Sequence, residues 1–218
     1  MRPQLRFVLL AASVALAVGL VLVVVLSGSP SHSVPQSSDF DGAVFPAGVH
    51  AHDLTLSNQH GQSVSLGDYR GQVVVLAFLS SNCRVCVLVA QQVRGALDEL
   101  EPTPHTGAGD SGESIPGVQT IFVSTDPTTD TPKSVSRFLD ETSLSGRVEY
   151  LTGTTTQLRP VWHDYGIAPV SRGKSASEAG TTVLLIDGEG TERVGFGLEQ
   201  ITPEGLAHDI RLLQATTG

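Results

Sequence analysis

The stretch Val73–Leu100 changes its pattern of apolar residues at a pair of cysteines, and this change restricts the fold more than any other feature. Val73–Leu79 holds no charge and is mostly β-branched or aromatic, which predicts a strand buried on both faces at the centre of a parallel sheet. From Cys86 onward the period becomes helical. One helical stripe contains Cys86, Val89, Ala90, Val93, Leu97 and Leu100. Cys83 and Cys86 are therefore expected where a central strand is followed by a helix, at the sheet edge where α/β proteins usually build their sites.

The composition is that of an acidic domain with little use of cysteine. The chain has 218 residues and two cysteines, so it is long enough to bury a core without a disulfide scaffold. A single close pair of cysteines suggests redox chemistry or half of a metal site. The formal net charge is −9, and once Arg2 and Arg6 before the apolar N-terminal run are set aside, 11 basic residues face 22 acidic ones. This balance argues against nucleic acid as a partner.

Residues 1–26 predict a cytoplasmic stub followed by a transmembrane anchor. Phe7–Leu26 is twenty residues without a charge, about 30 Å of helix, which spans a bilayer. A cleaved signal peptide usually has a shorter apolar core, so an uncleaved anchor is favoured and cleavage stays open as an alternative. Arg2 and Arg6 on the short side keep the N-terminus in the cytoplasm. The rest of the chain is then extracytoplasmic at the cell membrane, where a disulfide can persist.

The remaining chain divides into a flexible linker, residues 27–48, rich in Ser, Pro and Gly, and one domain, residues 49–218. Within the domain, residues 101–117 are expected to form a surface loop. We expect further strands at 53–56, 62–66, 118–124, 148–151, 181–186 and 191–196, and helices that begin at 132, 155 and 203. This order predicts a three-layer α/β sandwich with an N-terminal β-hairpin. A CxxC pair at the first helix is typical of a thioredoxin-like domain.

Five segments outside the cysteine pair are distinctive: VSTDPTTDTP, which begins at Val123, GDYRGQVVVLAF, LTGT, WHDYGI and LLIDGEG. Together they resemble the Sco/SenC family of membrane-anchored, thioredoxin-like proteins, and the first looks like the family's V-S-x-D-P-x-x-D-T-P signature. The resemblance covers roughly residues 50–214. It implies a protein that binds copper through two cysteines and a histidine and helps to assemble cytochrome oxidase, or one that reduces the cysteines of copper sites. The implied partners are a respiratory oxidase subunit or a copper protein.

The chain departs from the family pattern at the copper motif. The family's two cysteines generally have three residues between them, whereas two residues separate Cys83 from Cys86. Aligning LLIDGEG with the family's penultimate-strand motif places Ala179 where the family has its ligand histidine. No histidine occurs between His163 and His208. The third copper ligand is therefore missing from the position that the resemblance indicates.

The cysteines are predicted to perform thiol-disulfide exchange. Cys83 lies at a helix N-terminus, where free N–H groups and the helix dipole favour a thiolate. We therefore expect Cys83 to attack a partner disulfide or to be attacked by a partner thiol. Cys86 lies on the buried stripe and is expected to resolve the mixed disulfide on Cys83. The substrates would be protein thiols or disulfides, and exchange itself requires no cofactor.

Other functions stay open for the same two residues. Cys83 and Cys86 could act as metal ligands in a copper-binding chaperone that delivers copper to a respiratory oxidase, because soft thiolates favour Cu(I). The domain could also be a non-catalytic assembly or interaction module. A static disulfide is less favoured, because it would close a very short loop and stabilise the chain little. Zinc would need two further ligands, and no spacing in the sequence indicates them.

Five other polar residues could carry chemistry. His50 and His52 alternate on a predicted strand and could meet one metal ion, but a solvated segment is the better interpretation. His163 follows a tryptophan on a predicted helix, which favours packing or a surface position over metal binding. Asp126 and Asp130 lie beside a proline just before a helix, which favours turn formation and N-capping over catalysis, with Asp130 or Thr131 as the cap.

Overall fold

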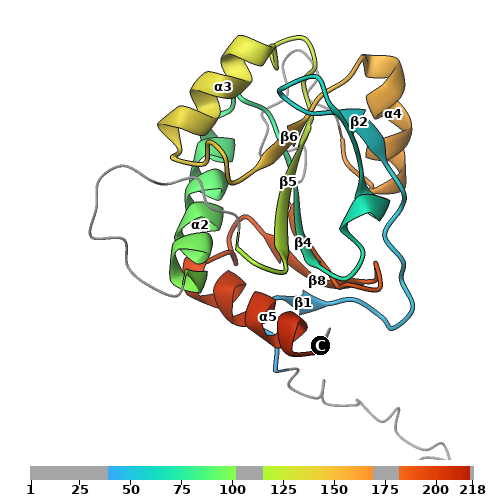
Figure 1. The fold of residues 1–218 in the computed structure, drawn as a ribbon, viewed down its shortest axis with the longest axis vertical. Coiled ribbons are helices and arrows are strands. Elements are labelled where there is room, and N and C mark those ends of the chain that lie inside the picture. The colour runs from blue at the N-terminus through green and yellow to red at the C-terminus, as the bar shows by residue number, and fades with distance from the viewer. Residues whose placement is uncertain (1–38, 102–114, 169–181, 217–218) are drawn as a thin grey trace, which may run out of the picture. The chain divides into compact units, whose positions relative to one another are not determined.

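A six-stranded mixed sheet runs through the centre of the domain (Figure 1). The computed structural model describes residues 39–101, 115–168 and 182–216. In spatial order the strands of the sheet are β1 (Ala43–Val44), β8 (Glu192–Gly197), β7 (Thr182–Ile186), β4 (Val73–Leu79), β5 (Val118–Ser124) and β6 (Glu149–Leu151). β5 runs parallel to both β4 and β6. β7 is antiparallel to both β4 and β8, and β1 is antiparallel to β8.

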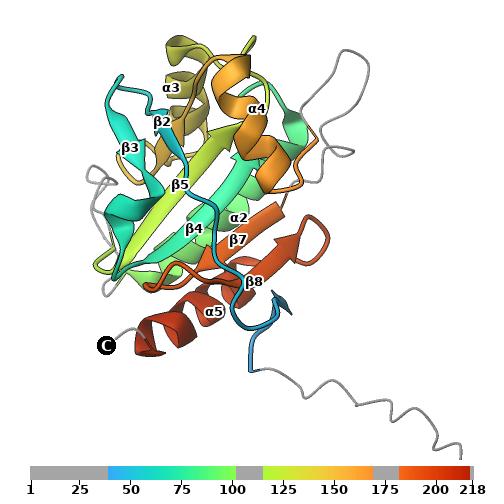
Figure 2. The ribbon, with the colours of Figure 1, turned by 90° about the vertical axis from the view of Figure 1, so that its right-hand side faces the viewer.

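Helices cover both faces of this sheet. The helices are α2 (Arg84–Leu100), α3 (Pro132–Glu141), α4 (Thr155–Asp164) and α5 (Pro203–Thr216). A separate hairpin of β2 (Thr55–Ser57) and β3 (Ser63–Ser65) leads into a short 3-10 turn, Leu66–Tyr69. Figures 1 and 2 show α2, α3 and α5 on one face of the sheet and α4 with the hairpin on the other. The domain therefore has three layers.

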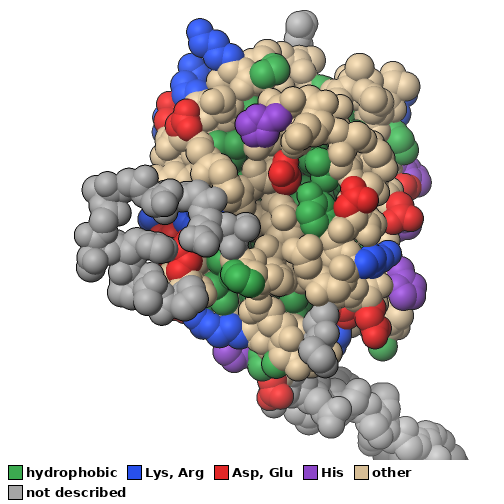
Figure 3. All heavy atoms as spheres, in the orientation of Figure 1, with side chains coloured by type: hydrophobic (Ala, Val, Ile, Leu, Met, Phe, Trp, Pro, Cys, Tyr) green, Lys and Arg blue, Asp and Glu red, His purple; other side chains and the backbone are tan. Residues whose placement is uncertain are grey.

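The surface reflects the acidic composition. Figure 3 shows acidic side chains on several parts of one face, between small apolar areas. Two large apolar side chains of the described residues stand out by their exposure, Val44 at 47% and Leu88 at 52%. Leu88 lies on α2, on the side away from the buried stripe.

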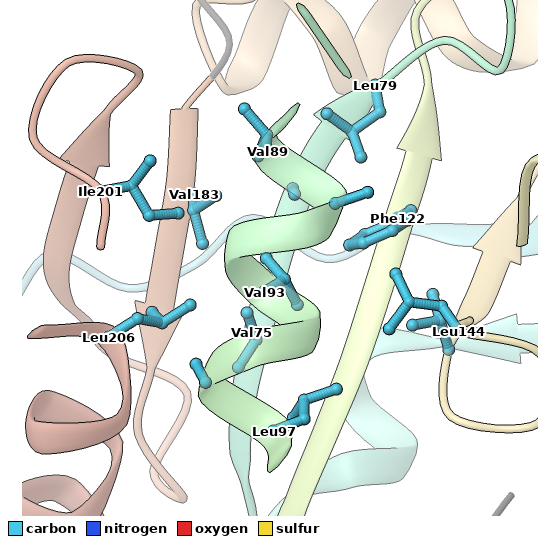
Figure 4. Close-up of a cluster of buried hydrophobic side chains, with 14 of the residues drawn as sticks. Val75, Leu79, Val89, Val93, Leu97, Phe122, Leu144, Val183, Ile201 and Leu206 are labelled. Carbon is cyan, nitrogen blue, oxygen red and sulfur yellow. The ribbon is translucent and has the colours of Figure 1, made fainter. Parts of the chain in front are cut away.

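β4 lies between two hydrophobic cores, one on each face of the sheet. All seven of its residues are at most 2% exposed. Val75 belongs to the same core as Val93 of α2 and Phe122 of β5 (Figure 4). Leu76 belongs to the opposite core, with Leu158 of α4. Because both faces of β4 are covered, an uninterrupted apolar sequence is the one that this position accepts.

The structure confirms the predicted three-layer, thioredoxin-like sandwich with its N-terminal hairpin. β4 and β5 have the predicted bounds, and the bounds of the other predicted strands differ by no more than two residues, whereas β1 was not predicted. The expectation of a parallel sheet around β4 is wrong on one side, because β7 is antiparallel to it. An apolar run reports that both faces of a strand are buried, and burial does not fix the direction of the neighbouring strand.

The N-terminal predictions fall mostly on residues that the structure does not describe. The predicted anchor, residues 7–26, and most of the predicted surface loop, residues 102–114, lie outside the described ranges. None of the helices in the described ranges is long and apolar enough to cross a membrane. β1 lies within the segment predicted as a linker, where it pairs with β8.

Candidate active site: the cysteine pair

Cys83 and Cys86 form a disulfide at the start of α2. Their Cα atoms are 5.1 Å apart. Cys83 is the N-cap residue of α2, and Cys86 lies in the first helical turn. The structure thus confirms that both cysteines lie where the central strand is followed by a helix.

The two cysteines differ in exposure, and the sulfur atom of each accepts a hydrogen bond from a backbone N–H. Cys83 is partly exposed, and its Sγ accepts from the backbone nitrogen of Cys86 at 3.1 Å. Cys86 is 1% exposed, and its Sγ accepts from the backbone nitrogen of Ser80 at 3.4 Å. Such donors stabilise a thiolate. Cys83 is therefore the sulfur that an external reagent can reach, and Cys86 is the one kept inside.

The loop between β4 and α2 is held by the carboxylate of Asp130. The Oδ1 atom accepts hydrogen bonds from the Ser81 backbone nitrogen at 2.8 Å, from Ser81 Oγ at 2.7 Å and from Ser80 Oγ at 3.3 Å. The Oδ2 atom accepts from Ser124 Oγ at 2.6 Å and from Tyr150 Oη at 3.1 Å. Asp130 is only 5% exposed. Five donors thus compensate for the burial of this side chain.

Tyr150, one of these donors, is fully buried. Burial, and after it the charge of Asp130, raise the pKa of Tyr150 well above its usual value. The phenol therefore stays protonated and available as a donor. Its ring meets those of Phe122 and Phe138 edge to face, so the hydroxyl is held in place by the core.

Asp130 is the site residue whose role sequence analysis did not find. Of the two predicted caps of α3, Asp130 and Thr131, the cap is Thr131, whose Oγ1 accepts a backbone N–H of the first helical turn at 3.2 Å. Asp126 does fit the turn interpretation, since its carboxylate accepts a backbone N–H of its own turn at 3.1 Å. The one available signal for Asp130 is the pair Ser80–Ser81, two hydroxyl residues at the end of an otherwise apolar strand. A buried carboxylate would accept hydrogen bonds from the hydroxyl groups of these two serines.

The histidine candidates are found at the surface, as predicted. His50 and His52 are exposed, and 87% of the His163 side chain is exposed. In the described parts of the chain, one group of three His, Cys, Asp or Glu residues has its ligand atoms within 4.8 Å of one another: Asp41, His208 and Asp209. This group does not include either cysteine.

The cysteine pair offers copper two soft ligands. After reduction, two thiolates this close together suit Cu(I). No described group of His, Cys, Asp or Glu residues adds a third ligand to them. Ala179, the position aligned with the family's ligand histidine, lies outside the described residues. The residues present therefore fit Cu(I) held by two sulfur atoms.

Comparisons of the chain with a family model and with individual proteins point to the same family. A family model described as SCO1/SenC matches residues 46–214. The human protein named Protein SCO2 homolog, mitochondrial, is 26% identical over 126 residues, which is 57% of this chain and 43% of that protein. The match thus spans less than half of that relative's length.

Solved structures of Sco proteins share the fold. ScoI of Bradyrhizobium japonicum with copper bound is 21% identical, with a TM-score of 0.56 over 76% of this chain and 99% of that one. BsSco, a member of the Sco family of cytochrome c oxidase assembly proteins for which a disulfide switch has been identified, is 19% identical, with a TM-score of 0.60 over 78% of this chain and 95% of that one. The family model covers most of the chain. This chain therefore belongs to the SCO1/SenC family.

Proposed function

We propose that this chain is a thiol-disulfide oxidoreductase that uses Cys83 and Cys86. The observation that carries the proposal is the asymmetry of the pair: Cys83 is partly exposed at a helix N-terminus, whereas Cys86 is 1% exposed. Two-step exchange requires one sulfur that meets the partner and one that stays close to resolve the mixed disulfide. A purely structural role is less well supported, because a bridge between positions three apart stabilises the chain little.

Exchange proceeds in two steps. A partner thiolate attacks Cys83 Sγ, the bond between Cys83 and Cys86 breaks, and Cys86 leaves with the electron pair and takes up a proton. The partner's second thiol then loses its proton and attacks the mixed disulfide, and Cys83 leaves as a thiolate. The partner's two thiols are oxidised to a disulfide while Cys83 and Cys86 are reduced. The reverse sequence reduces a partner disulfide.

The proposed partners are the cysteines of a copper site in a respiratory oxidase subunit or a copper protein. The support is the relationship to BsSco, which belongs to a family of cytochrome c oxidase assembly proteins and has a disulfide switch. The proposed location is the outer face of the cell membrane, with residues 7–26 as the anchor. Its support is the twenty-residue apolar run behind two arginines.

Copper is a second candidate, as cargo held by the reduced pair. The support is the copper bound to ScoI of Bradyrhizobium japonicum, which shares this fold, together with the two adjacent sulfur donors. The reduced dithiol that exchange produces is also the form that binds Cu(I). The two activities can therefore belong to one cycle.

Single replacements of the cysteines test the exchange proposal. In the full-length protein, Cys86→Ser leaves Cys83 as the one thiol, and we expect it to form a lasting mixed disulfide with oxidised glutathione, visible as a mass increase. Cys83→Ser should form far less of this adduct, because Cys86 is buried. Equal adduct formation in the two variants would contradict the assignment of Cys83 as the reacting sulfur.

A copper titration separates the two candidates. Reduced wild type and reduced Cys83→Ser are titrated with Cu(I) in competition with a chelator. Retention of one Cu(I) by the wild type and its loss in the variant would support the cargo role. Weak retention by both, with adduct formation as described for Cys86→Ser, would favour exchange alone.

A further inference from the structure

Asp130 is connected to the cysteine pair through one residue, Ser80. The Ser80 hydroxyl donates to Asp130 Oδ1 at 3.3 Å, and the Ser80 backbone nitrogen donates to Cys86 Sγ at 3.4 Å. Ser81, the next residue, donates to the same Oδ1 through both its backbone nitrogen and its hydroxyl, at 2.8 and 2.7 Å. The carboxylate thus holds Ser80, whose backbone N–H faces Cys86, and the residue that follows it.

Capping does not explain why this carboxylate is buried here. Thr131 caps α3, so the helix does not need Asp130. A buried carboxylate is costly unless hydrogen bonds compensate for the loss of water. Three of the five bonds that compensate here come from the loop that precedes Cys83.

We propose that Asp130 is a positioning residue for thiol-disulfide exchange: by fixing Ser80 and Ser81, it aims the Ser80 N–H at the sulfur of Cys86, the leaving group when Cys83 is attacked. This inference rests on the proposed function of the pair. When the disulfide bond breaks, the electron pair and its negative charge go to Cys86 Sγ. A donor that is already in place stabilises this charge without reorganisation. Without Asp130, the loop that carries Ser80 would have to reorganise before the Ser80 N–H could donate to Cys86 Sγ.

Two substitutions at Asp130 separate positioning from stability. Asp130→Ala removes every acceptor, whereas Asp130→Asn keeps the shape and one oxygen that can accept from Ser81. The rate at which dithiothreitol reduces the full-length oxidised protein is measured by acid quench, alkylation and mass spectrometry, under conditions where circular dichroism shows each variant folded. Asp130→Ala should react about tenfold more slowly, a barrier increase of about 1.4 kcal/mol. Asp130→Asn should recover to within about threefold of the wild-type rate.

Asp126→Ala is the matched control. Asp126 lies in the same turn, but among the described hydrogen bonds its carboxylate accepts from Thr128 and Thr129 and is linked to the cysteine loop only indirectly, through the 3.5 Å contact of Thr129 Oγ1 with Ser80 Oγ. Its loss should lower thermal stability modestly and leave the reduction rate within about twofold of wild type. A merely structural Asp130 would behave in the same way, with a lower melting temperature and an unchanged rate.

Ser81→Ala keeps the inference testable if Asp130→Ala does not fold. Ser81 is partly exposed, and this change removes one of its two bonds to Asp130, so the rate should fall about threefold. A wild-type rate in folded Asp130→Ala or in Ser81→Ala would overturn the inference, as would an Asp130→Asn rate no faster than that of Asp130→Ala. A wild type that dithiothreitol cannot reduce would overturn the proposed function as well. A reactive wild type with unaffected variants would overturn the positioning role alone.

Discussion

Glu192 is a buried residue whose carboxyl group has a raised pKa. It is the first residue of β8 and is 8% exposed. Burial raises its pKa, and nearby His52 partly opposes this. Because the folded state holds the proton more tightly than the unfolded chain does, the stability from this group is fully present below the unfolded pKa. It is lost as pH rises through the higher, folded pKa.

Glu192→Gln should therefore raise the melting temperature at neutral pH, where the wild type must bury a charge. The advantage should shrink on acidification and disappear near the ordinary glutamate pKa of about 4.3. Thermal unfolding, monitored by circular dichroism at pH values from neutral down to the ordinary glutamate pKa, checks this prediction. Glu189→Gln, at an exposed position in the turn between β7 and β8, is the control and should show no such pH dependence of the melting temperature. An advantage of Glu192→Gln that is the same at every pH would contradict this account.

Asp126 and Asp130 show which residue roles could be predicted from the sequence and which could not. The same local pattern, a proline turn before a helix, assigns both to turn formation, and this is right for Asp126. Asp130 contacts Ser80 and Ser81, which precede it by about fifty positions. A contact over that distance depends on the parallel pairing of β4 and β5, which local spacing does not reveal. The cysteines, in contrast, were predictable because a strand and a helix meet at them.

Among the elements, α2 is the one on which the site depends most directly. Its buried stripe fixes the helix against β4, and Leu97 on this stripe is 3% exposed. Leu97→Ala should reduce the free energy of unfolding by about 2–5 kcal/mol, through lost burial and a residual cavity. Leu88→Ala removes the same atoms from a side chain that is 52% exposed and should change stability by no more than about 0.5 kcal/mol. Urea unfolding of both variants measures the difference, and similar losses would contradict the packing of α2.

α5 holds the start of the domain through one buried carboxylate. Asp209 is 0% exposed, and its oxygens accept from the backbone nitrogens of Asp41 at 2.9 Å and Gly42 at 3.0 Å, just before β1. Asp209→Ala should cost about 1.5–3 kcal/mol, because charge-assisted bonds are lost and buried N–H groups lose their partners.

Hydrogen exchange of residues 41–44 should report the same change, since β1 would separate from β8 more often. His208→Ala is the comparison: its side chain is 48% exposed and pairs with Asp41 and Asp209. It should cost less than about 1 kcal/mol. Unchanged exchange at β1 in Asp209→Ala would show that pairing with β8 is enough to hold this strand.

At the scale of the whole molecule, most of the architecture could be read from apolar patterning. The two longest buried strands were predicted to the residue, and the layers followed from the alternation of strands and helices. Strand direction around β4 could not be read in this way, because burial on both faces looks the same for parallel and antiparallel neighbours. The family relationship was visible in segments outside the cysteine pair and is confirmed by the match over residues 46–214.

The whole account depends on whether the disulfide between Cys83 and Cys86 exchanges reversibly. The most direct measurement is the fraction of oxidised pair in the full-length protein, equilibrated from both the oxidised and the reduced state in glutathione buffers of varied ratio. We predict one reversible two-electron transition, identical from both directions, at a potential above the value of about −300 mV below which structural disulfides usually lie. A pair that stays oxidised at every glutathione ratio, or that cannot be reoxidised, would contradict the central claim.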